Sequence, residues 1–208
     1  MDSGLPTMSK QPYGVRRFGW QSLGLWVVVT TAGFVAAGDL HFQALGPTVP
    51  LNPQDIRPTA VLMGFVFGSV SGLIISTLQW LVLKPHAPTA RLWIPLNVVG
   101  FGLAHALNDA VPYRPLDLPY ILGIGGVMLG LVQSIALRGA VSASIIWAPI
   151  AAVAWVMGLL LGHAWLSLID KNPIAEIGAV FGTAGMTIGA ATGVALMLLL
   201  PRRATSDR

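Results

Sequence analysis

Cysteine is absent from this 208-residue chain, which excludes disulfide bonds, thiolate nucleophiles and cysteine-based metal or cluster sites. Charged residues are also scarce: they make up 10% of the sequence, against about 25% in soluble domains. Most of the remainder is apolar, with 54% hydrophobic residues and a mean hydropathy of +0.72. The composition therefore predicts an integral membrane protein.

Six continuously apolar stretches reach the length of about 20 residues that a helix needs to cross a bilayer core of roughly 30 Å. A helix satisfies its own backbone polar groups in lipid, whereas the strands of a β-barrel would alternate apolar and polar residues. We therefore expect an all-α integral membrane protein with six transmembrane helices in one domain, residues 18–200. The stretches lie near residues 18–38, 59–83, 92–111, 118–137, 144–166 and 174–200.

Charge distribution predicts the orientation in the membrane. If both ends lie on one side, that side carries nine of the 12 Lys and Arg residues, and the positive-inside rule makes it cytoplasmic. Residues 1–17 are then a cytoplasmic segment without a signal-peptide cleavage site, and 201–208 are a cytoplasmic tail. The high pI reflects this topology and predicts no nucleic-acid partner. The nine are Lys10, Arg16, Arg17, Lys84, Arg91, Arg138, Arg202, Arg203 and Arg208.

The connections predict how the helices pair. Most are short, which favours antiparallel hairpins of sequential helices, so we expect three hairpins. Residues 39–58 are rich in proline and predict a long outer loop that begins with Asp39 and contains His41.

An internal repeat with an offset of 54 residues links the second and third helices to the fourth and fifth. It predicts construction by copying of a helix pair, and so describes architecture better than activity. Six positions recur without a gap: Gly72, Gln79, Leu83, Lys84, Trp93 and Pro95 become Gly126, Gln133, Leu137, Arg138, Trp147 and Pro149.

The three even-numbered helices also share a stripe of small residues. Steps of 4, 4, 3 and 4 keep its five positions on one helical face, and small residues let membrane helices approach closely. We therefore expect these faces to form the contacts between hairpins; a cavity or flat ligand against the bare backbone is the alternative. The stripes are Gly68, Gly72, Ser76, Gln79 and Leu83; Leu122, Gly126, Gly130, Gln133 and Leu137; and Gly185, Gly189, Gly193, Leu196 and Leu200.

The segment GSVSGLIISTLQWLVLK at 68–84 carries a resemblance. With the Trp-starting helix that follows, it resembles the pattern G-x-x-x-G-x-x-Q-W-x-x-L-K/R of small, uncharacterised multi-pass membrane proteins from bacteria. The match is best over 64–138 and weaker over 139–200, where Leu196 stands at the position expected for glutamine. The resemblance implies a six-helix fold in the cytoplasmic membrane and no activity.

Gln79 and Gln133 are the conspicuous polar residues of the stripes. Both are expected about one turn from the cytoplasmic ends of their helices, where Trp80, Trp93 and Trp147 would form an interfacial aromatic belt. The simpler interpretation is that each glutamine hydrogen-bonds a neighbouring helix or loop. The alternative is a symmetric pair that binds one polar ligand.

The outer ends of the helices hold a second polar group. His105, Asn108 and Asp109 are spaced i, i+3 and i+4 and therefore share one helical face, while His163 corresponds to Asp109 by the 54-residue offset. Ionisable groups at this depth are costly and usually face the bundle interior or a wet cavity. Asp39, His41, Asp170 and Glu176 are expected at the same level. Three interpretations stay open: a hydrogen-bond network, a substrate or proton site using His105 and Asp109, or axial ligation of a haem or chlorin by a histidine.

Enzyme signatures are missing. There is no H-x-x-x-H spacing for zinc, no phosphate loop with lysine and no pair of membrane carboxylates. The GSVSG segment is similar to the serine-bearing segment of rhomboid-type proteases, but its order relative to His105 and Asn108 is wrong for that family.

We therefore expect no enzyme. The sequence favours a non-catalytic subunit or assembly protein of a larger membrane complex, one that could contain haem or pigment and transduce energy. Its expected partners are the lipid bilayer and other membrane subunits, or further copies of the chain; no cofactor is specified. The alternative is a transporter or ligand-binding protein with a polar site at the outer end. Many transporters are built from repeats, but repeated hairpins of the same orientation lack inverted symmetry.

Overall fold

A computed structural model describes residues 17–45, 58–110, 118–141, 143–166 and 173–200. These residues form six α-helices and a short 3₁₀ helix, η2, and contain no strand. The helices are α1 (Trp20–Leu45), α2 (Pro58–Leu83), α3 (Trp93–Ala110), α4 (Leu118–Ala136), α5 (Trp147–Leu166) and α6 (Pro173–Leu199), with η2 (Ser144–Ile146) preceding α5. The all-helical class predicted from the composition is confirmed.

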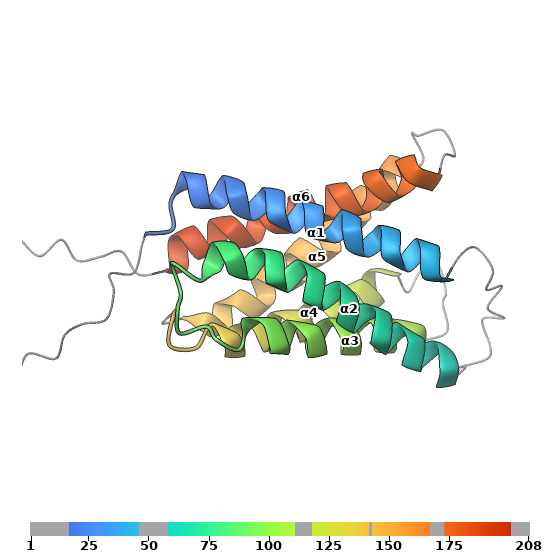
Figure 1. Ribbon diagram of the computed structural model, residues 1–208, viewed down its shortest axis with the longest axis horizontal. Coiled ribbons are helices and arrows are strands. Elements are labelled where there is room, and N and C mark those ends of the chain that lie inside the picture. Colours follow the sequence, from blue (N-terminus) through green and yellow to red (C-terminus); the bar gives the residue numbers. More distant parts are fainter. Residues whose placement is uncertain (1–16, 46–57, 111–117, 142, 167–172, 201–208) are drawn as a thin grey trace, which may run out of the picture.

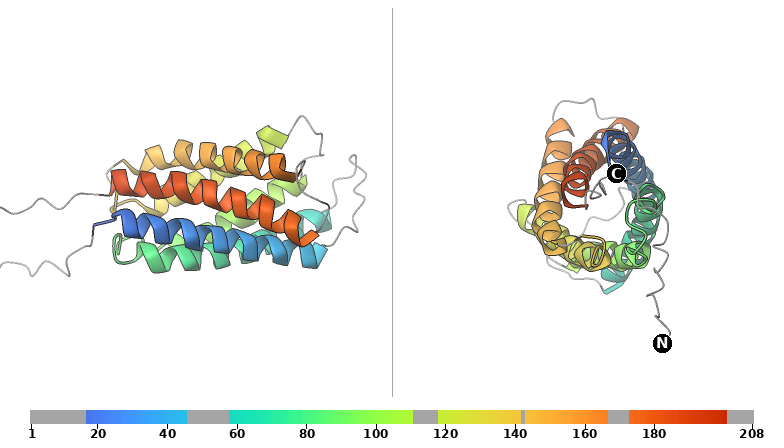
Figure 2. Two further views of the ribbon diagram at one scale, coloured as in Figure 1. Left: turned by 90° about the horizontal axis from the view of Figure 1, so that it is seen from above. Right: turned by 90° about the vertical axis from the view of Figure 1, so that its left-hand side faces the viewer.

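The six helices run antiparallel to their neighbours and form a closed ring (Figures 1 and 2). Each helix contacts the next one along the chain, and α6 contacts α1 to close the ring. The first residue of α1 and the last residue of α6 consequently lie at the same end of the molecule (Figure 1). We call this the terminal end and the other the distal end.

The outside of the ring is apolar and the inside holds polar side chains. Leucine, valine and isoleucine project outward at positions such as Val28 (62% exposed), Leu62 and Leu198. The described residues that are buried and polar include Thr30, Ser76, Gln79, Asn97, Gln133 and Thr192. This is the reverse of a soluble bundle, in which the polar groups face water.

Four segments are long and apolar enough to cross a membrane: Trp20–Gly38, Pro58–Leu83, Ser144–Trp165 and Gly178–Leu199. Within the described residues of α4, Ile124–Ala136 is a shorter apolar stretch, and α3 has 18 residues. Pro95 and Pro149 occupy the first turns of α3 and α5, as predicted, where a missing backbone N–H costs little.

The end of α1 differs from the prediction. The sequence was expected to leave the helix at residue 38, yet α1 continues to Leu45, so Asp39 and His41 belong to the helix and not to an outer loop. No glycine or proline occurs from Asp39 to Leu45, and Gly46 and Pro47 follow. Helix-breaking residues, and not the first charged residue, decide where this helix ends.

Candidate functional site: a polar and aromatic centre inside the ring

Glycines on α2, α4 and α6 bring these helices close to the backbones of their neighbours. A β-carbon on Gly72 would lie 2.8 Å from the Asn97 carbonyl oxygen on α3. A β-carbon on Gly126 would lie 3.0 Å from the Ala152 α-carbon on α5, and one on Gly185 would lie 2.7 Å from the Thr31 α-carbon on α1. The predicted role of the stripes is confirmed, because all three contacts join different hairpins. The Leu122 side chain lies outside the described residues.

The indole of Trp147 and the side-chain amides of Gln133 and Asn97 join α3, α4 and α5 inside the ring. The Trp147 Nε1–H donates to Gln133 Oε1 at 2.7 Å, and Gln133 Nε2 donates to Asn97 Oδ1, also at 2.7 Å. Asn97 Nδ2 in turn donates to the Trp93 carbonyl oxygen at 2.7 Å. All of these side chains are buried, so Gln133 is the link between two neighbouring helices.

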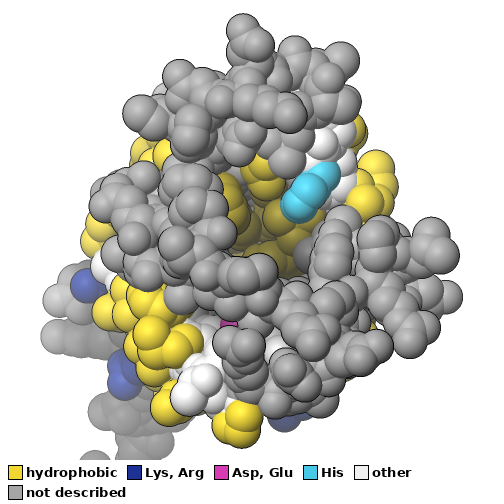
Figure 3. Space-filling view, turned by 90° about the vertical axis from the view of Figure 1, so that its right-hand side faces the viewer, with side chains coloured by type: hydrophobic (Ala, Val, Ile, Leu, Met, Phe, Trp, Pro, Cys, Tyr) yellow, Lys and Arg dark blue, Asp and Glu magenta, His cyan; other side chains and the backbone are white. Residues whose placement is uncertain are grey.

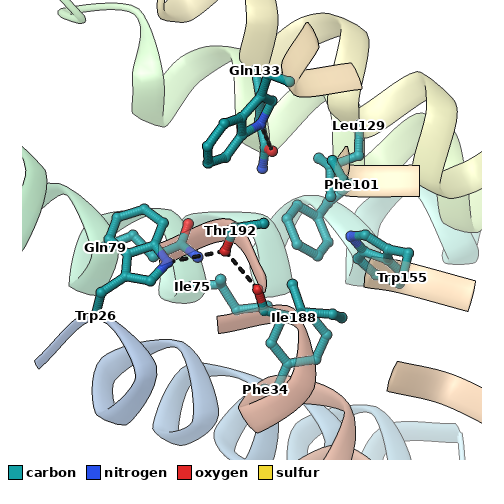
Figure 4. A pocket seen from close by; sticks show the side chains of 12 residues that line it. Trp26, Phe34, Ile75, Gln79, Phe101, Leu129, Gln133, Trp155, Ile188 and Thr192 are labelled. Carbon is teal, nitrogen blue, oxygen red and sulfur yellow. Dashed lines mark hydrogen bonds between the residues drawn. The ribbon is translucent and has the colours of Figure 1, made fainter. Parts of the chain in front are cut away.

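Two further hydrogen bonds connect α1 to α6 and to α2. The Trp26 Nε1–H donates to Thr192 Oγ1 at 3.0 Å, and that hydroxyl donates to the Ile188 carbonyl oxygen at 2.6 Å. Gln79 Nε2 donates to Thr30 Oγ1 at 3.1 Å. Gln79, Gln133 and Thr192 thus point from α2, α4 and α6 toward the same internal space (Figure 4).

Aromatic side chains fill the interior of the helix ring on both sides of this polar space. Nearer the terminal end, the Trp93 ring lies between Trp26 and Trp147, with centroid distances of 5.9 and 6.3 Å.

Toward the distal end, Phe34, Phe101 and Trp155 contact one another with centroids 5.5 to 6.3 Å apart. Two aromatic layers, the tryptophan layer and the phenylalanine layer, therefore enclose the polar groups.

A small cavity lies between the two aromatic layers. Ile75, Leu129 and Ile188 line it together with the two glutamines and Thr192. The volume open to the centre of a water molecule is about 10 Å³, which is about enough for one water. No haem, chlorin or sugar-sized molecule fits in a space of this size, so the cavity does not supply a site for a large ligand.

The two glutamines behave as the simpler interpretation predicts, since both hydrogen-bond neighbouring helices. The expected aromatic belt is wrong for two of its three members. Trp93 and Trp147 are 0% and 1% exposed, because α3 and α5 turn these indoles into the ring, where Gln133 accepts the N–H of Trp147. Only Trp80 is partly exposed at the outer surface.

The distal cluster on α3 is held by its own backbone and by α2. His105 Nδ1 lies 2.9 Å from the Phe101 carbonyl oxygen one turn earlier, and its ring stacks on the Phe101 ring at 6.4 Å. The Asp109 carboxylate lies against Gly64 of α2. Asn108 is exposed and approaches Asp109 Oδ1 at 3.4 Å. The three residues thus lie together at the distal end of α3, where His105 and Asp109 both pack against glycines of α2.

His163 on α5 is not joined to that cluster by any contact among the described residues. It is exposed, and its Nδ1 lies 2.8 Å from the Leu159 carbonyl oxygen of its own helix. No group of three or more His, Asp or Glu side chains within the described ranges could hold a metal ion. The side chains of Asp39, His41, Asp170 and Glu176 lie outside the described residues.

The distal end is hollowed at its centre. Figure 3 looks into this end and shows a recess with hydrophobic side chains at its bottom and a histidine at its edge.

Thr30, Asn97 and Thr192 complete the internal polar centre but were not predicted from the sequence. A signal for two of them exists in the spacing W-x-x-x-T at 26–30 and W-x-x-x-N at 93–97, which puts an indole and a polar residue on one helical face. No family model matches this sequence, and no curated protein and no solved structure is significantly similar to it. Functional conclusions therefore depend on the geometry alone.

Proposed function

We propose that this protein is a non-catalytic membrane subunit or assembly protein that acts through its outer surface. The observation that carries the proposal is the packed interior. Two aromatic layers fill the helix ring, and the space between them holds about one water. Sites for drug-sized molecules are clefts or cavities of about 300–1,000 Å³, so the interior of the ring has no room for such a molecule. Because the interior is packed, the surface that remains for binding is the outer one, where exposed leucine, valine and isoleucine side chains contact lipid and partner helices.

In this proposal all six helices span the cytoplasmic membrane of a bacterium and both termini are cytoplasmic. α3 and α4 have 18 and 19 residues, within the range of roughly 17–25 that crosses a bilayer. Exposed Lys84, Arg91 and Arg138 lie at the terminal end, in agreement with the positive-inside rule. The bacterial assignment rests on the sequence resemblance.

Three repeated hairpins are the proposed origin of the ring. Gln133 and Trp147 are 14 residues apart, as are Gln79 and Trp93. In α6, Thr192 accepts the indole N–H of Trp26, the role that Gln133 has for Trp147. We therefore align Thr192, and not Leu196, with the two glutamines. Leu196 then corresponds to Leu83 and Leu137, and all three leucines are fully buried.

The state of the protein in its native membrane tests the subunit proposal. The chain with an affinity tag should be extracted in mild detergent or directly into nanodiscs, then weighed by native mass spectrometry and examined by absorption spectroscopy. We expect complexes of defined stoichiometry with other membrane proteins or with further copies of the chain. A haem or chlorin band would indicate a pigment in the complex. A monomer that releases one small organic molecule on denaturation would refute the proposal.

The distal recess favours one alternative, a protein that binds or transports a small molecule at that end. It is apolar at its bottom and has a histidine at its edge (Figure 3), the combination of lining and polar group that ligand sites use. If this alternative holds, substitution of His105 or His163 by alanine lowers ligand recovery while the mass of the complex stays unchanged.

A further inference from the structure

Two polar atoms at the polar centre have no hydrogen-bond partner: Gln79 Oε1 and Trp93 Nε1. Their residues are 4% and 0% exposed. A buried donor or acceptor without a partner costs about 1–3 kcal/mol, so buried polar atoms of this kind normally bind protein groups or an internal water. One of the two is a donor and the other an acceptor, which is the combination that one bridging molecule satisfies.

The corresponding pair 54 residues later is closed directly. Trp147 Nε1 donates to Gln133 Oε1 at 2.7 Å, while the other end of that glutamine donates to Asn97. Gln79 has the same orientation, because its Nε2 donates to Thr30 and its Oε1 is left. The α2–α3 contact is therefore the open counterpart of the closed α4–α5 contact.

Space for a bridging molecule adjoins Gln79. The internal cavity is lined by this glutamine and has about 10 Å³ open to the centre of a water molecule. Trp93 does not line the cavity, but its ring lies 5.9 Å from that of Trp26 and 6.3 Å from that of Trp147, which both do. Internal waters need a polar site and room for about one water. A larger molecule is excluded by the cavity volume, which leaves a single water as the ligand of matching size and hydrogen-bonding capacity.

We propose that one internal water is a built-in part of the α2–α3 contact. It accepts the Trp93 Nε1–H and donates a proton to Gln79 Oε1. Both orphaned atoms are satisfied in this way, and Gln79 becomes the centre of a link from α1 through α2 to α3. The inference concerns the internal polar centre and does not depend on which partners the outer surface binds.

Nuclear magnetic resonance of the full chain in nanodiscs tests the proposal. Indole N–H signals of ¹⁵N-labelled protein are assigned by single Trp→Phe variants, and rotating-frame Overhauser spectra are recorded to water. We expect a cross peak to water at the Trp93 indole, with the sign that marks proximity and not chemical exchange. The Trp147 indole also lines the cavity, so the comparison is made on the Trp93 signal itself, between the unmodified protein and a variant at Gln79.

Gln79→Met is the matched variant, because methionine has a similar length and no acceptor amide. It should abolish the water cross peak of Trp93 while the Trp147 signal keeps its chemical shift, which shows that the fold is retained. Absence of the cross peak in the unmodified protein would overturn the proposal, as a direct Trp93–Gln79 bond would then remain. Persistence of the cross peak in Gln79→Met would overturn it as well.

Discussion

Single hydrogen bonds at the polar centre decide how α1 meets its neighbours. The indole of Trp26 is fully buried and donates to one hydroxyl, that of Thr192 on α6. Membrane helices gain no hydrophobic drive for association within lipid, so interhelical hydrogen bonds and close packing have to supply it. Substitution of a residue that makes one of these hydrogen bonds should therefore weaken the contact that closes the ring.

Substitution of Thr192 by valine keeps the shape of the side chain and removes the acceptor for the Trp26 N–H. We expect a loss of about 1 kcal/mol in the free energy of unfolding, since interhelical hydrogen bonds in membranes have about this value. Reversible unfolding in mixed detergent micelles measures it. Thr77 is exposed on α2, and Thr77→Val is the control that should leave stability unchanged. Equal effects of both variants would contradict the assignment.

Part of the polar centre could be predicted at the level of residues. Gln79 and Gln133 stand out because uncharged polar groups in apolar helices need partners. Their partners Thr30 and Asn97 could not be identified, since hydrophobic patterning does not fix the order of helices around a ring. The spacing of His105, Asn108 and Asp109 predicts that they share one face of α3, but it does not predict that the Asp109 carboxylate packs against Gly64 of α2.

At the scale of helices, small residues set the distances between hairpins. A β-carbon on Gly126 would lie 2.9 Å from the Trp155 β-carbon and 3.0 Å from the Ala152 α-carbon on α5, so only a hydrogen atom fits there. Gly24 on α1 has nothing within 4 Å of the position of a β-carbon. These two glycines differ in surroundings and not in helical propensity, which makes them a matched pair.

Gly126→Leu should therefore separate α4 from α5 and destabilise the protein by about 3 kcal/mol, the upper end of the usual cost of overpacking. Gly24→Leu should be neutral or slightly stabilising, because replacing glycine in a helix recovers up to about 1 kcal/mol. Thermal melting monitored by size-exclusion chromatography in detergent compares the two. A loss of stability in Gly24→Leu as large as that in Gly126→Leu would refute the proposed packing.

Helix positions were largely predictable and helix ends were less so. Long apolar runs give the helices because lipid permits little else. The exception is α1, where the charge of Asp39 predicts the start of a loop, although the helix continues through Leu45. A charge near the membrane surface does not break a helix, whereas the Gly46–Pro47 pair offers both a flexible and a ring-constrained residue.

At the scale of the whole molecule, contact between α6 and α1 closes the ring. A β-carbon on Gly182 would lie 3.7 Å from Val35 Cγ2, so the two positions are in van der Waals contact, as the two half-cystines of a disulfide are. Because the chain has no cysteine, the double variant V35C/G182C contains a single possible bridge. Mild oxidation should produce an intramolecular cross-link, detected as a shift in electrophoretic mobility. The pair V28C/G182C, with Val28 on the outer surface, should give none.

Single cysteines also test the orientation of the ring in the membrane. Asn108 at the distal end and Thr89 in the α2–α3 connection at the terminal end are both exposed. A membrane-impermeant maleimide added to intact cells should label Asn108→Cys and leave Thr89→Cys unlabelled until the cells are opened. The reverse pattern would contradict cytoplasmic termini. Neither substitution changes the basic residues on which the orientation depends.

The closed ring also bears on the order in which the six helices can follow one another along the chain. The stripe glycines on α2, α4 and α6 join α2 to α3, α4 to α5, and α6 to α1, so two of these pairs are contiguous in sequence and the third joins the last helix to the first. A circular permutant that begins at α2 and ends at α1 would make every such pair contiguous. The same permutant would, however, separate α1 from α2, where a β-carbon on Gly33 would lie 3.1 Å from the Ile75 α-carbon. A closed ring of helices therefore has no starting point at which every contact between neighbours is local in sequence.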